Sequence, residues 1–285
     1  MSAGIYPSEP GPVALARALA PIRARGGIDV RVRAADATTH LAALTEWGGY
    51  RLAFPKTHAR HLEAVQINTG GGVVAGDQLD FALAVGAEAD LVFTTPSAER
   101  IYRSPGPVSE INARLRVAPG GRLDWLPQET ILYSGARLRR RYEIDLARSS
   151  RLLLVETLVF GRIASGEVMA DGLLHDLWRV RRDGELVFAE ALRLEGDFAS
   201  LLARPALAAG GRAAALLLFI ADDAEDRLSI VRDGLEDASS ICGASAWNSL
   251  LVTRFLAVRP ADVRKDVIKI VERLGSRRVP RAWSV

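Results

Sequence analysis

The 285-residue sequence contains a single cysteine, Cys242, and four histidines. One cysteine excludes an internal disulfide framework and any zinc site built from several cysteines. Long hydrophobic runs are also missing, because the longest, residues 213–221, is far shorter than the ~20 residues that a membrane-spanning helix needs. The first 27 residues lack the basic start of a signal peptide, and Arg17 and Pro21 interrupt their apolar stretch. We therefore expect a reduced, cytoplasmic protein without membrane attachment.

The sequence also lacks an excess of charge of one sign. Its 37 lysines and arginines nearly balance its 34 aspartates and glutamates, which leaves a formal net charge of +3. That balance argues against nucleic acid as the main partner. The apolar fraction of 49% and the charged fraction of 25% are ordinary for globular proteins and exclude global disorder.

The hydrophobic pattern favours a mainly β protein. Repeated proline and glycine predict a flexible N-terminal arm over residues 1–27, followed by one folded domain over residues 28–285. Alternating polar and apolar residues predict a half-buried strand at residues 111–117, and the Pro-Gly-Gly turn after it predicts a return strand. The apolar run at residues 152–155 predicts a strand buried on both faces. Asp183-Gly184 lies between two apolar stretches and predicts a β-hairpin.

The C-terminal part of the sequence has a different pattern. Residues 214–221 and 247–258 predict strands. Asp222 or Asp223 is suited to cap a following amphipathic helix, and Pro260 is suited to the first turn of a second helix. We find no fixed-period repeat. The expected architecture is a single, mainly β body of many short strands, with a small α/β element of two helices toward the C-terminus.

A glycine-rich stretch at residues 69–77 has the glycine spacing of a phosphate-binding P-loop at Gly71 and Gly76. A P-loop continues with lysine and serine or threonine, whereas Asp77 and Gln78 occupy these positions. A carboxylate there would repel phosphate. We therefore interpret the stretch as a tight turn that needs positive φ, with Asp77 either capping the turn or lining the interior.

Other reactive side chains give weaker signals. His58 and His61 could share a metal ion only on a helix, which the nearby Pro55 disfavours, so we interpret them as solvated loop histidines. No serine–histidine–aspartate pattern is recognisable, and Cys242 is interpreted as a small buried side chain. Arg140 shares a strand face with apolar residues, so we expect it to pair with an acid or to lie at an interface.

Carboxylates within apolar strand contexts are the most unusual feature. Glu129, Glu156 and Glu167 each follow or interrupt apolar segments. A buried carboxylate needs a cation, hydrogen-bond donors or a metal ion. Arg162 is a candidate partner for one of them. Structural ion pairs and a functional polar channel both remain open at this point.

Several stretches, taken in order, resemble the urease accessory protein UreD family, called UreH in some organisms. The resemblance covers residues 28–285, and Pro96 and Ser134 depart from the residues that the family often has at these positions. The stretches that carry it are residues 71–79, 94–104, 125–130, 135–138, 160–167, 178–194 and 280–283.

The resemblance implies a cytoplasmic β-helix-like scaffold without enzyme activity. Such a protein binds UreF, reaches the GTPase UreG through UreF, and docks on the urease apoprotein to support GTP-dependent nickel insertion. The resemblance further implies a homodimeric arrangement within the accessory complex, transient Ni²⁺ and no tightly bound cofactor. We expect the strand at residues 247–258 and the C-terminal helix near Trp283 to bind UreF.

A water-filled nickel path has been proposed for the family. Mapped by motif, Asp77, Glu129 and Glu167 are expected to line such a path, with Arg162 as an ion-pair partner. The alternative function is a β-helical carbohydrate-active hydrolase or lyase that uses paired carboxylates. A retaining glycosidase would need two carboxyl groups about 5–5.5 Å apart in an open cleft.

Overall fold

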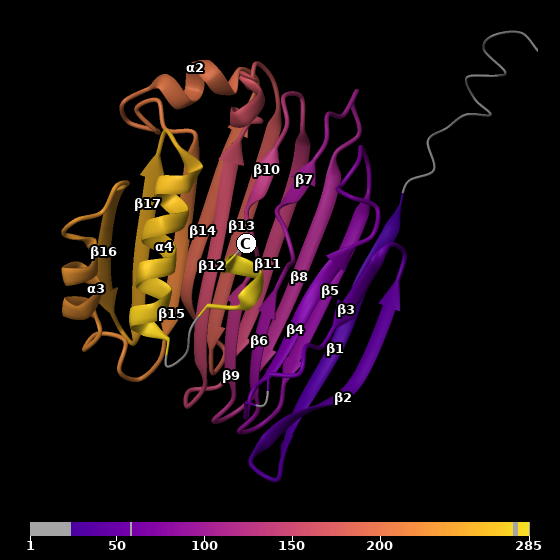
Figure 1. Cartoon of the computed structure of the whole chain (residues 1–285), viewed down its shortest axis with the longest axis vertical. Coiled ribbons are helices and arrows are strands. Elements are labelled where there is room, and N and C mark those ends of the chain that lie inside the picture. The colour runs from indigo at the N-terminus through magenta and orange to yellow at the C-terminus, as the bar shows by residue number, and fades with distance from the viewer. Residues whose placement is uncertain (1–23, 58, 276–278, 285) are drawn as a thin grey trace, which may run out of the picture.

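Two β-sheets dominate the computed structural model, which describes residues 24–57, 59–275 and 279–284 (Figure 1). The expected N-terminal arm lies outside the described residues up to residue 23. Strand β1 begins at Arg25, so the folded body starts slightly earlier than the sequence predicted. The first sheet contains seven strands. In spatial order they are β14 (Glu185–Glu195), β13 (Leu173–Arg182), β11 (Arg137–Leu146), β8 (Ser109–Val117), β5 (Gln78–Val85), β1 (Arg25–Ala35) and β2 (Thr38–Trp47).

The second sheet contains ten strands. Eight follow one path, in the order β16 (Ile241–Trp247), β17 (Leu250–Ala257), β15 (Ala213–Ile220), β12 (Arg151–Phe160), β9 (Arg122–Leu126), β6 (Asp90–Thr94), β4 (Leu62–Asn68) and β3 (Tyr50–Ala53). The short strands β7 (Glu99–Ile101) and β10 (Thr130–Leu132) pair with each other, and β10 also pairs with β12.

The central strands wind as a solenoid, which confirms the β-helix-like body that the family resemblance implied. From β5 to β13 the chain passes repeatedly from the first sheet to the second and back, so successive strands of one sheet pair in parallel. The prediction that the strand after the Pro-Gly-Gly turn returns alongside the preceding strand is wrong. Strand β9 does not pair with β8 but joins β6 and β12 in the other sheet. The turn therefore carries the chain across the body instead of closing a hairpin.

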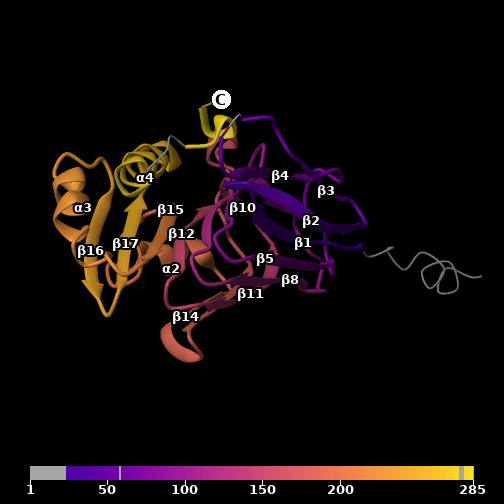
Figure 2. The same cartoon turned by 90° about the horizontal axis from the view of Figure 1, so that it is seen from below.

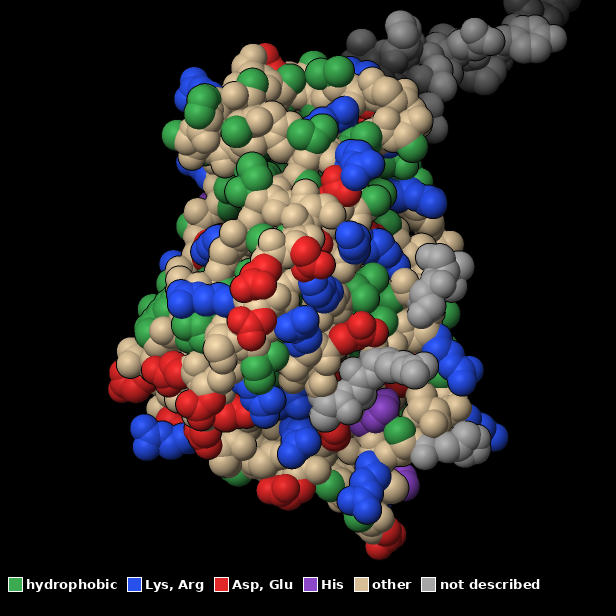
Figure 3. Space-filling model, turned by 60° about the vertical axis from the view of Figure 1, so that its left-hand side comes forward, with side chains coloured by type: hydrophobic (Ala, Val, Ile, Leu, Met, Phe, Trp, Pro, Cys, Tyr) green, Lys and Arg blue, Asp and Glu red, His purple; other side chains and the backbone are tan. Residues whose placement is uncertain are grey.

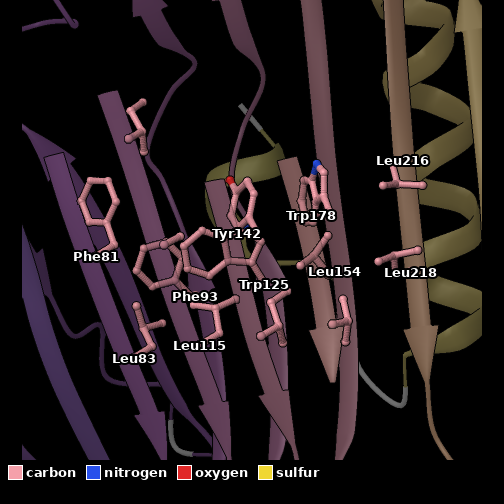
Figure 4. Packing of buried hydrophobic residues seen from close by; sticks show 14 of the residues in the cluster. Phe81, Leu83, Phe93, Leu115, Trp125, Tyr142, Leu154, Trp178, Leu216 and Leu218 are labelled. Atoms are coloured by element: carbon pink, nitrogen blue, oxygen red, sulfur yellow. The ribbon is translucent and has the colours of Figure 1, made fainter. Parts of the chain in front are cut away.

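The space between the sheets holds the main core. Figure 4 shows Phe93 and Trp125 of the second sheet facing Tyr142 and Trp178 of the first. The Phe93 and Trp125 rings stack with centroids 4.2 Å apart, and the Tyr142 and Trp178 rings stack at 3.9 Å. Trp125 and Tyr142 meet edge to face at 6.1 Å, which links the two stacks. Aromatic contacts of this kind add to the burial of large apolar surfaces.

A second core lies on the outer face of the ten-stranded sheet, under helix α4 (Pro260–Leu274) and helix α3 (Leu228–Leu235) (Figure 2). This helix layer explains why β12 is buried on both faces, as predicted from its continuous apolar run. The outer face of the seven-stranded sheet instead carries alternating charged residues. Basic and acidic side chains are interspersed on the surface that Figure 3 displays, in keeping with the balanced composition.

Several local predictions have clear outcomes. The Asp183-Gly184 hairpin joins β13 to β14, with both residues at positive φ. Helix α4 begins at Pro260, as predicted. Asp222 and Asp223 do not cap α3, which begins after Arg227 without a side-chain cap. The strand predicted at residues 247–258 is β17, which begins at Leu250 after a tight turn at residues 248–249 that joins it to β16.

The sequence analysis did not predict the short helix α2 (Phe198–Ala203), which is capped by Asp197. The sequence signal for that cap is the aspartate itself, whose side chain accepts the backbone N–H of Ser200. Within the described ranges, no helix combines the length and the apolar character needed to cross a membrane.

Candidate functional site

Polar side chains form a seam inside the body, between the two sheets. We use "inter-sheet seam" for the six residues Tyr50, Asn68, Glu99, Arg140, Glu156 and Asp176. They fall into two groups, which line the same small internal cavity of about 60 Å³ from opposite sides, apart from Asn68 and Asp176. Burying polar groups is costly unless they are paired, so each group is considered with its partners.

Arg140 of β11 occupies the first group and is 3% exposed. Its Nη1 donates to Glu156 Oε2 at 2.7 Å, and its Nε and Nη2 donate to the two carboxylate oxygens of Asp176 at 3.0 and 2.7 Å. The other Glu156 oxygen accepts the Trp125 indole N–H at 2.9 Å and the Tyr142 hydroxyl. Burial alone would lower the pKa of Arg140, but the two carboxylates raise it well above its ordinary value.

This arrangement fulfils the expectation that Arg140 pairs with an acid. The alternation of β11 places Arg140 on the same inward face as Leu138 and Tyr142. Glu156 comes from the facing sheet, so the ion pair joins the two sheets across the core. Arg140 and Glu156 also border an open groove of about 540 Å³ between β14 and the β15–β17 side of the second sheet. The two residues therefore separate the internal cavity from this groove.

Glu99 of β7 occupies the second group. The Asn68 amide donates to both Glu99 carboxylate oxygens, at 3.0 and 3.2 Å, and also to the Tyr50 hydroxyl at 3.0 Å. Burial, helped by the nearby charge of Asp77, raises the pKa of Glu99 to about 7, although Asn68 and Arg100 oppose the change. Burial and the charges of Glu99 and Asp77 likewise raise the pKa of Tyr50. Glu99 is thus a carboxyl group that titrates near neutral pH inside the protein.

Asp77 lies at the end of the glycine-rich turn and is 3% exposed. Its carboxylate accepts the backbone N–H groups of Val74 and Ala24, both at 2.9 Å. Gly71, Gly72 and Gly76 all have positive φ, as the turn interpretation requires. Asp77 therefore caps the turn and ties it to the start of β1, while its charge reaches Glu99.

Glu129 lies at the opposite side of the ten-stranded sheet from the seam. Its carboxylate forms an ion pair of 2.9 Å with Arg264 of α4. Arg264 also donates to Gln128 Oε1 at 2.5 Å and to the backbone carbonyl of Trp283 at 2.7 Å. Glu129 is connected to the seam only through its backbone carbonyl, which accepts the Glu99 N–H at 2.9 Å.

Glu167 and Arg162 lie together at the end of the solenoid. Arg162 Nη2 donates to Glu167 Oε1 at 2.9 Å, and the Arg162 backbone N–H donates to Oε2 at the same distance. Burial would raise the pKa of Glu167, but these bonds to Arg162 lower it. The three carboxylates expected along a nickel path therefore have three different partners, and the structure does not bring them together.

No preformed metal centre is present in the described part of the chain, where no three histidine, cysteine, aspartate or glutamate side chains are grouped as ligands. His58 lies outside the described residues, so the His58–His61 pair cannot be placed. Cys242 is half-buried, and burial raises the pKa of its thiol. An activated thiolate would need a lowered pKa.

Sequence reasoning missed four of the six seam residues, Tyr50, Asn68, Glu99 and Asp176. Asp176 had a usable signal, because it alternates with Leu174 and Trp178 on the inward face of β13. Glu99 had none, because β7 has three residues and is too short for a periodic pattern.

Comparisons with known proteins place this geometry in context. The sequence model of one family, described as UreD urease accessory protein, matches residues 24–284. A protein named urease accessory protein UreD from Xanthobacter autotrophicus is 46% identical over 262 residues, covering 92% of this chain and 90% of the relative. Proteins of the same name from a Methylobacterium species and from Rhodopseudomonas palustris are 48% and 44% identical. They cover 87% and 92% of this chain, and 90% and 93% of their own lengths.

Proposed function

Because the chain belongs to the UreD urease accessory protein family and so has a role in urease maturation, we propose that it is a non-catalytic cytoplasmic scaffold. In this proposal it binds UreF, reaches the GTPase UreG through UreF, and docks on the urease apoprotein during GTP-dependent nickel insertion. The observation that carries the proposal is the family match over residues 24–284.

The glycine-rich turn supports the proposal that UreG, and not this chain, binds and uses GTP. Asp77 occupies the position where a P-loop has lysine, and its carboxylate accepts the backbone N–H of Val74 in the loop. We expect calorimetry to detect no micromolar GTP binding by the isolated protein. Such binding would contradict the proposal that only UreG uses GTP.

We further propose that Ni²⁺ passes transiently along the inter-sheet seam, with Asp77 at its glycine-turn end. Oxygen ligands hold Ni²⁺ less tightly than imidazole or thiolate, which suits a route that must release its ion. Asp77 and Glu99 supply two such carboxyl groups near each other. Glu129 and Glu167 would line the route only if the ion displaced Arg264 and Arg162 from them.

The test separates a nickel role for Asp77 from a folding role. Asp77→Asn and Asp77→Ala variants would be tested for capture of UreF and urease, and for urease activity after nickel addition. A role in the route predicts intact assembly with severely reduced activation. The matched control is Asp80→Asn in the adjoining strand β5, since Asp80 is on the solvent face, where it accepts a 3.2 Å hydrogen bond from Asn112 and forms a 3.7 Å ion pair with Arg114. Normal activation by both Asp77 variants would exclude the role, and loss of assembly in both would leave a structural role alone.

We propose that UreF binds the open side of the ten-stranded sheet, within the expected segment at residues 247–258. Trp247 is 43% exposed and Val258 is 58% exposed, whereas β17 between them is mostly buried. Trp283 is only 5% exposed and contacts β6 and β9, so in this proposal it supports the surface indirectly, through Arg264 of α4, the helix that packs on β17. Hydrogen exchange in β16 and β17 should slow when UreF is added. Equal exchange with and without UreF would remove these strands from the interface.

The arrangement of carboxylates gives no support to the alternative of a carbohydrate-active hydrolase or lyase. That chemistry needs two carboxyl groups facing one another across an open cleft. Asp77 is buried and accepts hydrogen bonds from two backbone N–H groups. Glu129 and Glu167 each form an ion pair with an arginine.

A further inference from the structure

An open pocket of about 630 Å³ lies at the end of the solenoid, away from the inter-sheet seam. We call it the arginine pocket, because Arg103, Arg137 and Arg162 line it together with Glu167 and Asp171. It is formed by the loop after β7, the segment between β10 and β11, and the segment between β12 and β13. We propose that the arginine pocket binds an oxyanion.

The charges around the pocket are only partly balanced. Glu167 neutralises Arg162 through their 2.9 Å ion pair. Arg103 and Arg137 form no ion pair or side-chain hydrogen bond with any described residue. Asp171 is the remaining acid, and no ion pair joins it to either arginine. With three arginines and two carboxylates, the lining has a net positive charge.

Arg137 makes the strongest case for a missing counter-charge. Its Nε is buried and has no hydrogen-bond acceptor among the described residues. Arg137 lies close enough to Glu195 to lower the pKa of that carboxyl, but Glu195 is already hydrogen-bonded to Arg193 at 2.9 Å. Because an unsatisfied buried donor is destabilising, the guanidinium is available to a ligand that accepts hydrogen bonds.

The walls of the pocket hold the guanidinium groups in place before any ligand arrives. The Arg162 guanidinium lies 4.7 Å from the centre of the Tyr133 ring, and Glu167 fixes its other side. The Arg103 stem packs over Gly135, where an added Cβ would lie 2.8 Å from Arg103 Cγ. The Gly135 N–H donates to the Asp171 carbonyl at 2.7 Å, which ties two of the segments together. Less ordering is then needed on binding.

The chemistry of the lining selects the class of ligand. Guanidinium groups bind carboxylates and phosphates through paired, charge-assisted hydrogen bonds, and they repel metal cations. The ligand is therefore a phosphate or carboxylate group, supplied either as a free anion or by an acidic side chain of a partner protein. The same reasoning makes this pocket a poor binding site for Ni²⁺, so it argues against Glu167 as part of the nickel route proposed above and leaves Asp77 and Glu99 in that route.

Isothermal titration calorimetry tests the proposal with two probes, inorganic phosphate and N-acetylglutamate. Sodium chloride would keep the ionic strength constant, so that general screening does not imitate binding. We expect saturable binding of at least one probe. Binding of phosphate alone assigns a free anion to the pocket, and binding of N-acetylglutamate alone assigns a partner's acidic side chain. Binding of both assigns a site that accepts either source.

Variants make the assignment specific. Arg103→Gln and Arg137→Gln should each weaken binding by about tenfold, the effect of losing one charged hydrogen bond. Asp171→Asn should strengthen it, because a carboxylate repels an oxyanion. Arg139→Gln is the matched control, since Arg139 lies outside the pocket beside Glu110 and should leave affinity unchanged. Arg103 is exposed, so its variant remains informative even if Arg137→Gln does not fold.

The proposal fails if neither probe binds to the wild-type protein. It also fails if Arg139→Gln weakens binding as much as Arg103→Gln, or if Asp171→Asn weakens binding. Urease activation is not the readout, so a failure here leaves the proposed accessory function untouched.

Discussion

Arg140 of one sheet and Glu156 of the other form a 2.7 Å ion pair in the core, with side chains 3% and 4% exposed. Asp176 completes the group through a second 2.7 Å contact with Arg140. A single guanidinium therefore pairs with two buried carboxylates. Removing it would leave both acids unpaired in a region of low polarity, which is far more costly than removing an exposed pair.

The first prediction concerns Arg140→Met, which keeps much of the side-chain volume and removes the charge. We expect unfolding free energy at neutral pH to fall by about 3–5 kcal/mol, as for other broken buried ion pairs. Urea denaturation would measure it. The control is Arg139→Met, one residue away on the exposed face, where loss of the pair with Glu110 should cost less than about 1 kcal/mol. Similar losses in both variants would show that the buried group has no special role in stability.

The second prediction concerns the pH dependence of Glu99. Its pKa of about 7 in the folded protein exceeds the ordinary value of 4.5, so the folded state holds a proton that the unfolded state releases between these values. Glu99 therefore lowers stability as pH rises from 4.5 to about 7, and its full cost remains above that range.

Glu99→Gln removes this titration and keeps an acceptor for Asn68. The variant should match the wild type near pH 5 and be more stable at pH 8, by up to about 3 kcal/mol. Thermal or urea unfolding at the two pH values would measure the difference. The control is Glu110→Gln, which removes the exposed ion pair between Glu110 and Arg139. It should change the unfolding free energy by less than about 1 kcal/mol at either pH. A stability gain for Glu99→Gln that did not grow with pH would contradict the raised pKa.

How much the sequence could predict depends on how local each signal is. The alternation in β11 was enough to place Arg140 on the inward face and to require an acid beside it. The Asp183-Gly184 hairpin and the Pro260 helix start were equally local, and the structure contains both. Such features depend on backbone preferences and on the period of apolar residues, which neighbouring positions reveal.

The partners of these residues were not predictable in the same way. Glu156 lies across the core from Arg140 because the chain crosses between sheets at each turn, and the turn at residues 119–121 has the same Pro-Gly-Gly signal as a hairpin. Glu129 and Glu167 likewise looked alike in sequence, yet one is bound to Arg264 in α4 and the other to Arg162 nearby. Contacts between separate elements decided the outcome for Glu156 and Glu129, whereas Glu167 pairs with an arginine only five residues away.

The third prediction compares two neighbouring glycines in the turn before Asp77. Gly71 has φ +75° and open space around an added Cβ, so Gly71→Ala should cost only the roughly 1–2 kcal/mol of a left-handed backbone. A Cβ on Gly72 would lie 2.4 Å from Tyr102 Cε2 and 2.8 Å from the Arg100 carbonyl oxygen. Gly72→Ala should therefore add about 1–3 kcal/mol of overpacking to its backbone strain. Chemical denaturation of both variants would check the order, and a larger loss for Gly71→Ala would contradict the close packing of this turn against β7.

The fourth prediction concerns the anchoring of the C-terminal segment by Trp283. Its indole N–H lies 3.0 Å from the Leu126 carbonyl and 3.2 Å from Thr94 Oγ1, and the ring is 5% exposed against the ten-stranded sheet. Trp283→Phe keeps an aromatic ring but leaves the buried carbonyl without this donor, which should cost about 1–3 kcal/mol. Trp283→Ala also removes the packing and should cost about 3–5 kcal/mol.

The control for Trp283 is Trp247→Phe, because Trp247 is 43% exposed and should change stability by no more than about 0.5 kcal/mol. Hydrogen exchange gives a second readout. If Trp283 anchors the segment, exchange should accelerate in α4 and at Leu126 in the Trp283 variants and not in Trp247→Phe.

The same variants show whether Trp283 supports the UreF-binding surface or contacts UreF directly. A supporting Trp283 predicts weaker UreF binding in proportion to lost protection in α4 and β17, whereas Trp247→Phe should weaken binding without any loss of protection. Weaker binding in Trp283→Phe with unchanged exchange would contradict the supporting role and make Trp283 a direct contact.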